Sequence, residues 1–115
     1  MSIEKFEDII AWQKAKELTI ETYKIFKNSK DFNFKSQIER AMVSVMNNIA
    51  EGFERKTNNE FKHFLYIAKG SAGEFRSMLY LAKELEYITD EKFKELFEKI
   101  LVVSKIIAKF IQSLN

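Results

Sequence analysis

The sequence predicts an all-α protein, folded as an antiparallel up-down-up-down bundle of four helices. Its 115 residues include no proline and only three glycines, whereas a sandwich or barrel of short strands needs a tight turn roughly every 8–12 residues. Apolar residues make up 46% of the chain and recur at helical spacing, and charged residues make up 31%. A chain of this length supplies one hydrophobic core, so we expect a single domain over residues 1–115.

The first helix is expected from about Glu7 to Lys27 and the second from about Phe34 to Arg55. The polar residues 28–31 separate them, and Asn33 is a candidate N-cap because its side chain can accept from a free backbone N–H. Apolar residues along the second helix follow at steps of three or four, which places them on one face that must be buried. This face comprises Phe34, Ile38, Met42, Val45, Ile49 and Phe53.

The third helix is expected from about Asn58 to Glu86 and the fourth from about Asp90 to Ser113. Thr57 and Glu60 have the spacing of a capping box, and Thr89 or the aspartate after it can cap the fourth helix. Because short connections join long helices, consecutive helices are expected to be antiparallel neighbours. Their buried faces comprise Phe61, Phe64, Leu65, Ala68, Ala72, Phe75, Leu79 and Ala82 in the third helix, and Phe93, Leu96, Phe97, Ile100, Val103, Ile107, Phe110 and Ile111 in the fourth.

The residue types present do not favour an enzyme. The chain has no cysteine, which excludes disulfides, thiolate metal ligands and cysteine nucleophiles. Glu60 and His63 have the Glu-x-x-His spacing of di-iron bundles, but such a site needs two of these motifs and His63 is the single histidine. Residues 70–73 (GSAG) have neither the preceding strand nor the spacing of a phosphate-binding loop. We therefore expect no catalytic residue, no cofactor and no metal.

The sequence also bears on location and partners. No stretch of 18 apolar residues predicts a membrane span, and the first eight residues lack the apolar run of a signal peptide. We expect a cytoplasmic protein with no membrane partner. The 19 basic and 17 acidic residues leave a net charge of only +2, so affinity for nucleic acid must come from where the charges lie.

The most informative surface pattern is a basic stripe on the third helix, where basic residues and tyrosines recur at steps of three and four. Such steps keep side chains on one face over about 32 Å of helix. Lysine and arginine neutralise phosphates, and tyrosine rings stack on unpaired bases, although a solvated face with tyrosines over apolar neighbours is the alternative. The stripe comprises Lys62, Tyr66, Lys69, Gly73, Arg76, Tyr80 and Lys83, contains no acid, and is followed by Tyr87.

The second helix has more apolar surface than a lone bundle requires. Val43, Met46 and Ala50 fall beside its core face and widen the apolar arc to roughly 200°, against about 100–150° in a monomeric bundle. The third helix repeats this with Ile67, Met78, Leu81 and Leu85. The pattern favours an oligomer, unless the neighbouring helices of the same bundle bury these flanks. The candidate interface comprises Val43, Met46 and Ala50 with the polar Ser44, Asn47 and Glu51.

Several runs are specific enough to compare with a known family: residues 37–41 (QIERA), 44–52 (SVMNNIAEG), 64–71 (FLYIAKGS) and 12–15 (WQKA). They resemble the four-helix bundle proteins linked to bacterial 23S rRNA intervening sequences. The resemblance implies an antiparallel bundle, a homopentamer and a suspected affinity for RNA. It also places Gln37, Arg40, Ser44, Asn48, Glu51, Gly52, Gly70, Ser71 and Glu74 at recurrent positions, which we interpret as packing and subunit contacts.

The chain departs from the family pattern at Met46, where members usually have proline, and at Asn47, where alanine is common. Loss of the proline restores a backbone donor and predicts a straighter helix. A related branch, the accessory variability proteins of diversity-generating retroelements, binds a reverse transcriptase and nucleic acid.

Together these features predict a non-enzymatic, oligomeric protein that binds nucleic acid, most simply RNA. The basic stripe would carry the contact, helped by Arg40, Arg55 and Lys56. The alternative is a scaffold or accessory subunit whose stripe docks a protein partner such as a reverse transcriptase, because tyrosine and arginine also anchor protein interfaces.

Overall fold

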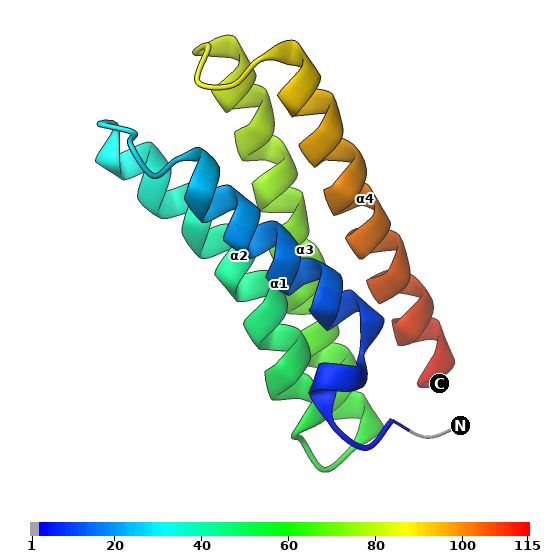
Figure 1. Cartoon of the computed structure of the whole chain (residues 1–115). Coiled ribbons are helices and arrows are strands. Elements are labelled where there is room, and N and C mark those ends of the chain that lie inside the picture. The colour runs from blue at the N-terminus through cyan, green and yellow to red at the C-terminus, as the bar shows by residue number, and fades with distance from the viewer. Residues whose placement is uncertain (1–2) are drawn as a thin grey trace.

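The computed structural model describes residues 3–115, and four long helices account for most of them (Figure 1). A short 3-10 helix, η1 (Phe6–Asp8), precedes α1 (Ile10–Ile25), α2 (Phe32–Phe53), α3 (Asn58–Glu84) and α4 (Asp90–Ser113). Each helix runs opposite to the one before it, and the C-terminus lies at the end of the bundle where α2 turns into α3 (Figure 1). The predicted all-α, up-down-up-down bundle is confirmed.

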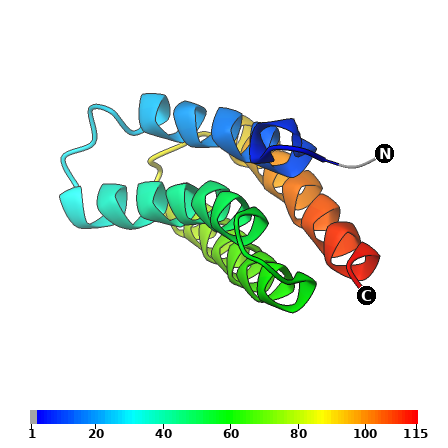
Figure 2. The same ribbon diagram turned by 90° about the horizontal axis from the view of Figure 1, so that it is seen from below.

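The helices contact one another in ring order, α1 on α2, α2 on α3, α3 on α4 and α4 back on α1, as the view from below shows (Figure 2). The bundle measures 43 × 22 × 19 Å. Met42, Phe75 and Ile107, from three different helices, are completely buried in the shared core. None of the helices within residues 3–115 is both long and apolar enough to span a bilayer.

The predicted core faces are confirmed, with informative exceptions at their edges. On α4, Leu96, Ile100 and Val103 are buried, whereas Phe93 and Phe97 are only half-buried. Half-buried aromatic rings at the edge of a core are available to side chains on the surface of a neighbouring helix. Both rings lie where α4 meets α3, which matters for the candidate site below.

The beginning of the first helix is predicted wrongly. Instead of one helix from Glu7, the chain forms η1, passes through an extended residue at Ile9 and only then begins α1. Ile9 is 1% exposed, so the extended backbone inserts this side chain into the core. Gln13 Nε2 donates a 2.8 Å hydrogen bond to the carbonyl oxygen of Glu7 and fastens η1 to α1. Burial of this apolar side chain favours the extended backbone at Ile9 over a helix continued from Glu7.

The N-caps are predicted correctly for two of the three helices concerned. Thr57 Oγ1 accepts from the backbone N–H of Glu60 at 3.1 Å and begins α3, and Thr89 caps α4 in the same way. For α2 the cap is Asp31 rather than Asn33, because Asp31 Oδ1 accepts from the N–H of Phe34 at 3.1 Å. α2 therefore begins two residues earlier than predicted, and both α2 and α3 end two residues earlier.

The end of α3 is closed by a residue in the left-handed conformation. Glu86 has φ 60°, and the next backbone N–H, that of Tyr87, donates to the carbonyl oxygen of Ala82 at 2.8 Å. This is the hydrogen bond of a Schellman motif, in which glycine usually takes the left-handed position. The motif turns Tyr87 back toward the beginning of α2.

Candidate nucleic-acid interface

The basic stripe lies along the seam between α3 and α4. At one end of it, Lys62 Nζ donates a 2.7 Å hydrogen bond to Oδ1 of Asn115, just beyond α4. At the other end, the ring of Tyr80 packs against Phe93 and Phe97, with centroid distances of 5.2 and 5.6 Å. α4 therefore holds both ends of the stripe in place.

The middle of the stripe is open. Tyr66 is 60% exposed, and Lys69 and Arg76 are exposed as well. Within residues 3–115, none of these three side chains makes a hydrogen bond or an ion pair to another group. A methyl group built on Gly73, between Lys69 and Arg76, would meet no atom within 4 Å. A ligand could therefore approach the α3 backbone closely at this point.

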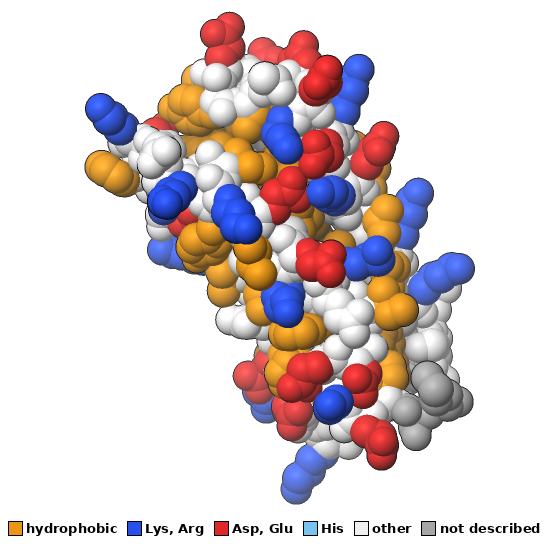
Figure 3. Space-filling model, viewed as in Figure 1, with side chains coloured by type: hydrophobic (Ala, Val, Ile, Leu, Met, Phe, Trp, Pro, Cys, Tyr) orange, Lys and Arg blue, Asp and Glu red, His pale blue; other side chains and the backbone are white. Residues whose placement is uncertain are grey.

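The cations of the stripe are not neutralised by carboxylates. In the part of the chain that the structure describes, the ion pairs lie along α2 and just past its end, within α4, and between α1 and α4, for example Lys99 Nζ with Glu21 at 2.8 Å. The face over α1 shows basic and acidic side chains interspersed (Figure 3). On the α3 seam, Lys69 and Arg76 make no ion pair with a carboxylate, so their positive charge is available to a ligand.

Lys83, the last residue of the stripe, makes a cation–π contact with α4. Its Nζ lies 4.8 Å from the centroid of the Phe93 ring. A cation over an aromatic face is attracted to it and gives up part of its freedom. The movement of Lys83 is therefore restricted, and its charge has no carboxylate partner among the described residues.

The structure separates the supporting basic residues from one another. The Arg55 guanidinium bonds to Glu51 at 3.1 Å and lies over the ring of Phe64 at 4.6 Å. Lys56 is exposed in the connection between α2 and α3. Arg40 lies on α2, in a groove on the other flank of α3. It is therefore not assembled with the basic stripe within one chain.

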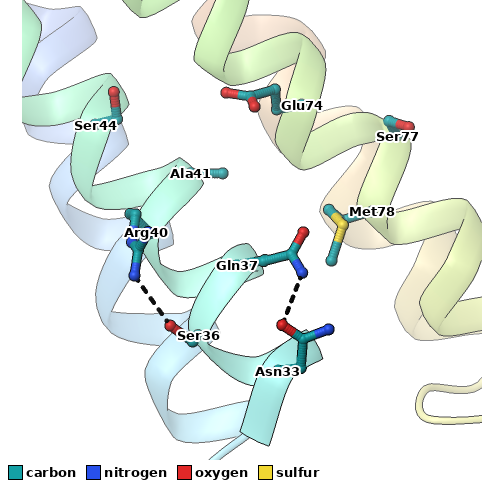
Figure 4. Close-up of a pocket in the computed structure, with 9 residues that line it drawn as sticks. All are labelled: Asn33, Ser36, Gln37, Arg40, Ala41, Ser44, Glu74, Ser77 and Met78. Atoms are coloured by element: carbon teal, nitrogen blue, oxygen red, sulfur yellow. Dashed lines mark hydrogen bonds between the residues drawn. The ribbon is translucent and has the colours of Figure 1, made fainter. Parts of the chain in front are cut away.

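That groove runs between α2 and α3 and encloses about 740 Å³. Arg40 donates to Ser36 Oγ at 3.4 Å and Gln37 donates to Asn33 Oδ1 at 3.1 Å, both on α2 (Figure 4). Facing them from α3 is Glu74 (Figure 4). The lining comprises Asn33, Ser36, Gln37, Arg40, Ala41, Ser44, Glu74, Ser77 and Met78.

The six candidate interface residues of α2 do not form one surface. Ser44 faces α3, where its hydroxyl and that of Ser71 share a 2.8 Å hydrogen bond. Val43 lies on the α1 side and lines a hollow with Tyr23. Met46 and Ala50 are half-buried, and Asn47 and Glu51 are exposed on the outer face. Helical spacing could not distinguish these flanks, because it does not show which neighbour each one meets.

Tyr87, the residue that follows the basic stripe in the sequence, packs against the beginning of α2. Its hydroxyl donates a 2.6 Å hydrogen bond to Oδ2 of Asp31, and its ring contacts that of Phe34 at 5.1 Å. The bond to this carboxylate raises the pKa of Tyr87 above that of an ordinary tyrosine. It also lowers the pKa of Asp31, with help from the Phe34 backbone N–H. Tyr87 therefore has a structural role at the corner of the bundle.

The sequence reasoning missed an apolar strip on the outside of α1 and α2. Ile20 and Tyr23 are about half exposed, and Phe32 is 75% exposed at the first position of α2. The helical spacing of Ile20 and Tyr23 outside the α1 core face was a usable signal. Phe32 was missed because the predicted second helix began after it. Of the four outer residues predicted on α3, Ile67, Leu81 and Leu85 are exposed, whereas Met78 is half-buried and packs against the core.

Fold and surface together define a small four-helix bundle protein with a basic stripe of lysine, arginine and tyrosine along the outside of its third helix. The 23S rRNA-intervening sequence protein family matches residues 7–109, and the chain belongs to this family. This confirms the resemblance seen in the runs of α2 and α3.

A solved structure agrees with this assignment. The chain is similar to the crystal structure of a protein of unknown function from the S23 ribosomal protein family of Bacteroides thetaiotaomicron. The two are 26% identical with a TM-score of 0.83, and the match covers 89% of this chain and 98% of the other. No curated protein matches the chain.

Proposed function

We propose that the protein binds RNA directly, without catalysing a reaction, through the basic stripe on α3. One observation carries the proposal: Lys69, Arg76 and Lys83 share one flank of α3 and have no bonded carboxylate among the described residues. Cations that are not internally neutralised exchange small counterions for phosphates, which is the main source of affinity in such complexes.

The stripe also has the second component of an RNA surface. Tyr66 and Tyr80 are 60% and 53% exposed and lie among the cations. Aromatic rings between basic groups are the usual platform for single-stranded nucleic acid. The printed name of the family refers to 23S rRNA, which supports RNA as the nucleic acid. Nothing in the stripe resembles a module that reads a particular base sequence.

The proposal is tested by removing charge from the stripe. A protein with Lys69→Gln, Arg76→Gln and Lys83→Gln should bind structured RNA more weakly, and the slope of log affinity against log salt should flatten by about 2–3. The matched control replaces Lys14, Lys24 and Lys27, which are exposed on the α1 side, by glutamine. It removes the same charge and should leave more of the affinity intact. Equal affinities for the two triple variants would contradict the stripe as the binding surface.

A second candidate function is docking of a protein partner on the same stripe. The packing of Tyr80 between Phe93 and Phe97 favours it, since a ring held in advance loses little entropy when it becomes an interface anchor. A gel shift of total cellular RNA with the isolated protein separates the two candidates. A shift supports direct RNA binding, and its absence supports the docking function.

We also propose that the protein works as a homo-oligomer, a ring of the kind that the family resemblance implies. Two separate apolar strips support it. The first strip comprises Ile20, Tyr23, Phe32 and Val43, on α1 and α2, and the second comprises Leu81 and Leu85, near the end of α3. A head-to-tail ring needs two different surfaces on each subunit, and it would repeat the basic stripe around its axis.

A further inference from the structure

The basic stripe contains the same arrangement of three side chains twice. In the first triad, Lys62 stands four residues before Tyr66 and Lys69 three residues after it. In the second triad, Arg76, Tyr80 and Lys83 repeat this spacing. The two triads are offset by 14 residues, which places the tyrosines about 21 Å apart along α3 and about 40° apart around its axis. Both triads therefore face the same way.

Both tyrosine rings are accessible, for different reasons. Tyr66 has no aromatic neighbour among the described residues, and Gly70, one turn further on, has no side chain to cover it. Tyr80 is supported by Phe97, whose ring meets it at 82°, and still exposes 53% of its surface. A flat ligand can thus reach both rings.

Gly73 lies midway between the triads, three residues before Arg76. Its surroundings are open, since an added Cβ atom would touch nothing within 4 Å. A chain of phosphates passing from one triad to the other would cross α3 at this glycine. The absence of a side chain there allows close approach to the helix backbone.

We propose that each triad is a subsite for one unpaired nucleotide of the same RNA strand. In each, the tyrosine stacks on a base while the two flanking cations contact the phosphates on either side of it. This inference rests on the proposed RNA-binding function and narrows the ligand to single-stranded RNA long enough to reach both triads. The span of about 21 Å corresponds to about six nucleotides at the stacked spacing of ~3.4 Å, and to fewer in an extended strand.

Double-stranded RNA does not fit this arrangement. Its bases are stacked on one another, so a ring on a protein surface contacts only phosphates, riboses and groove edges. Duplex would still be attracted by Lys69, Arg76 and their neighbours. The tyrosines therefore distinguish the two forms of RNA, whereas the cations do not.

The first experiment measures fluorescence anisotropy of a labelled, unstructured RNA of about twelve nucleotides and of the corresponding duplex. Tyr66→Ala should weaken binding of the single strand by about 5- to 100-fold and leave binding of the duplex nearly unchanged. Tyr66→Phe should keep the affinity, because the ring rather than the hydroxyl is required. Val102→Ala, which removes an exposed apolar side chain of α4 outside the basic stripe and both apolar strips, is the control and should have no effect. Tyr80→Ala is compared with Tyr80→Phe, since loss of its ring also removes packing against α4.

The second experiment uses RNA length to test whether one strand occupies both triads. An RNA of about three nucleotides is too short to span the triads, so Tyr66→Ala should lower its affinity only about twofold, because the second triad remains. For the twelve-nucleotide strand, the same substitution should lower the affinity by the full 5- to 100-fold. The loss is larger because the strand can then no longer bind both triads at once.

The outcomes separate this inference from the function it rests on. Unchanged single-strand binding by Tyr66→Ala, with weaker binding by the triple glutamine variant, would overturn the nucleotide subsites and leave RNA binding by the stripe intact. If Tyr66→Ala lowers the affinity for the short and the long RNA by the same factor, one strand does not occupy both triads. If the wild-type protein binds neither the single-stranded RNA nor the duplex, the proposed RNA-binding function itself is wrong.

Discussion

The hydroxyl of Tyr87 donates a 2.6 Å hydrogen bond to Oδ2 of Asp31, while Oδ1 of the same carboxylate caps α2 through the N–H of Phe34. Tyr87 belongs to the connection between α3 and α4, and Asp31 to the connection between α1 and α2. One carboxylate thus ties two distant corners of the chain together.

This bond predicts a pH dependence in both directions. The pKa of Asp31 is lowered, so its contribution to stability is present above the ordinary aspartate pKa and is lost as pH falls through the lowered value. The pKa of Tyr87 is raised, so its contribution is present below the ordinary tyrosine pKa and is lost as pH rises through the raised value. Thermal unfolding of Tyr87→Phe should show a smaller stability loss at both extremes than the wild type.

Phenolate absorbance supplies the direct check of the same bond. The wild type should contain one tyrosine that ionises later than the others, and Tyr87→Phe should lack it. Asp31→Asn is the matched control, because it keeps a capping oxygen and removes the charge. A late-ionising tyrosine that persists in Asp31→Asn would show that the carboxylate is not the cause.

Replacing Glu86 by glycine should stabilise the protein. It has φ 60°, a left-handed conformation that costs a residue with a Cβ atom about 1–2 kcal/mol. Glu86→Gly should raise the free energy of unfolding in urea by about 1 kcal/mol, after the greater freedom of glycine in the unfolded chain is deducted. Glu74→Gly, at an exposed position in the interior of α3, should instead lower it by about 1 kcal/mol. Equal effects of the two changes would show that the left-handed turn carries no strain.

The glycines of α2 and α3 should respond oppositely to alanine. A Cβ atom on Gly52 would lie 2.8 Å from Cβ of Phe64 and 3.2 Å from the carbonyl oxygen of Phe61. Gly52→Ala should therefore force α2 and α3 apart and lower the free energy of unfolding by about 1–3 kcal/mol. Gly70 is helical with open surroundings, so Gly70→Ala should raise it by about 0.5–1 kcal/mol. Urea denaturation measures both, and a stabilising Gly52→Ala would contradict the close approach.

The proposed ring predicts complementation between two variants. Val43→Glu places a charge in the first apolar strip, and Leu81→Glu places one in the second. Each protein alone should be monomeric by light scattering, with helical content unchanged. Mixed together they should form a dimer, because each keeps the strip that the other has lost.

Two controls make this test specific. Asn58→Glu, at an exposed position of α3 outside both strips, should leave the assembly unchanged. If Leu81→Glu alone stays fully assembled while Val43→Glu is monomeric, the contact is a symmetric one between first strips and the head-to-tail arrangement is wrong.

Much of the fold could be predicted because it depends on neighbours three or four residues apart. The apolar spacing around Met42, Phe75 and Ile107 identifies buried faces, and the caps at Thr57 and Thr89 involve only the next turn of the chain. The stripe from Lys62 to Lys83 was predictable for the same reason, since it lies on a single helix.

What the sequence determined by itself was therefore the set of helices, their buried faces and the side chains that each presents together. Tertiary structure decided which flank of α3 meets α4, where Tyr80 packs on Phe93, and that Arg40 lies in a different groove from Lys69. It also decided that Ile9 interrupts a helix and that Asp31 rather than Asn33 begins one. The physical reason is that spacing along a helix sets an angle around its own axis, whereas the neighbour at that angle depends on segments far away in the chain.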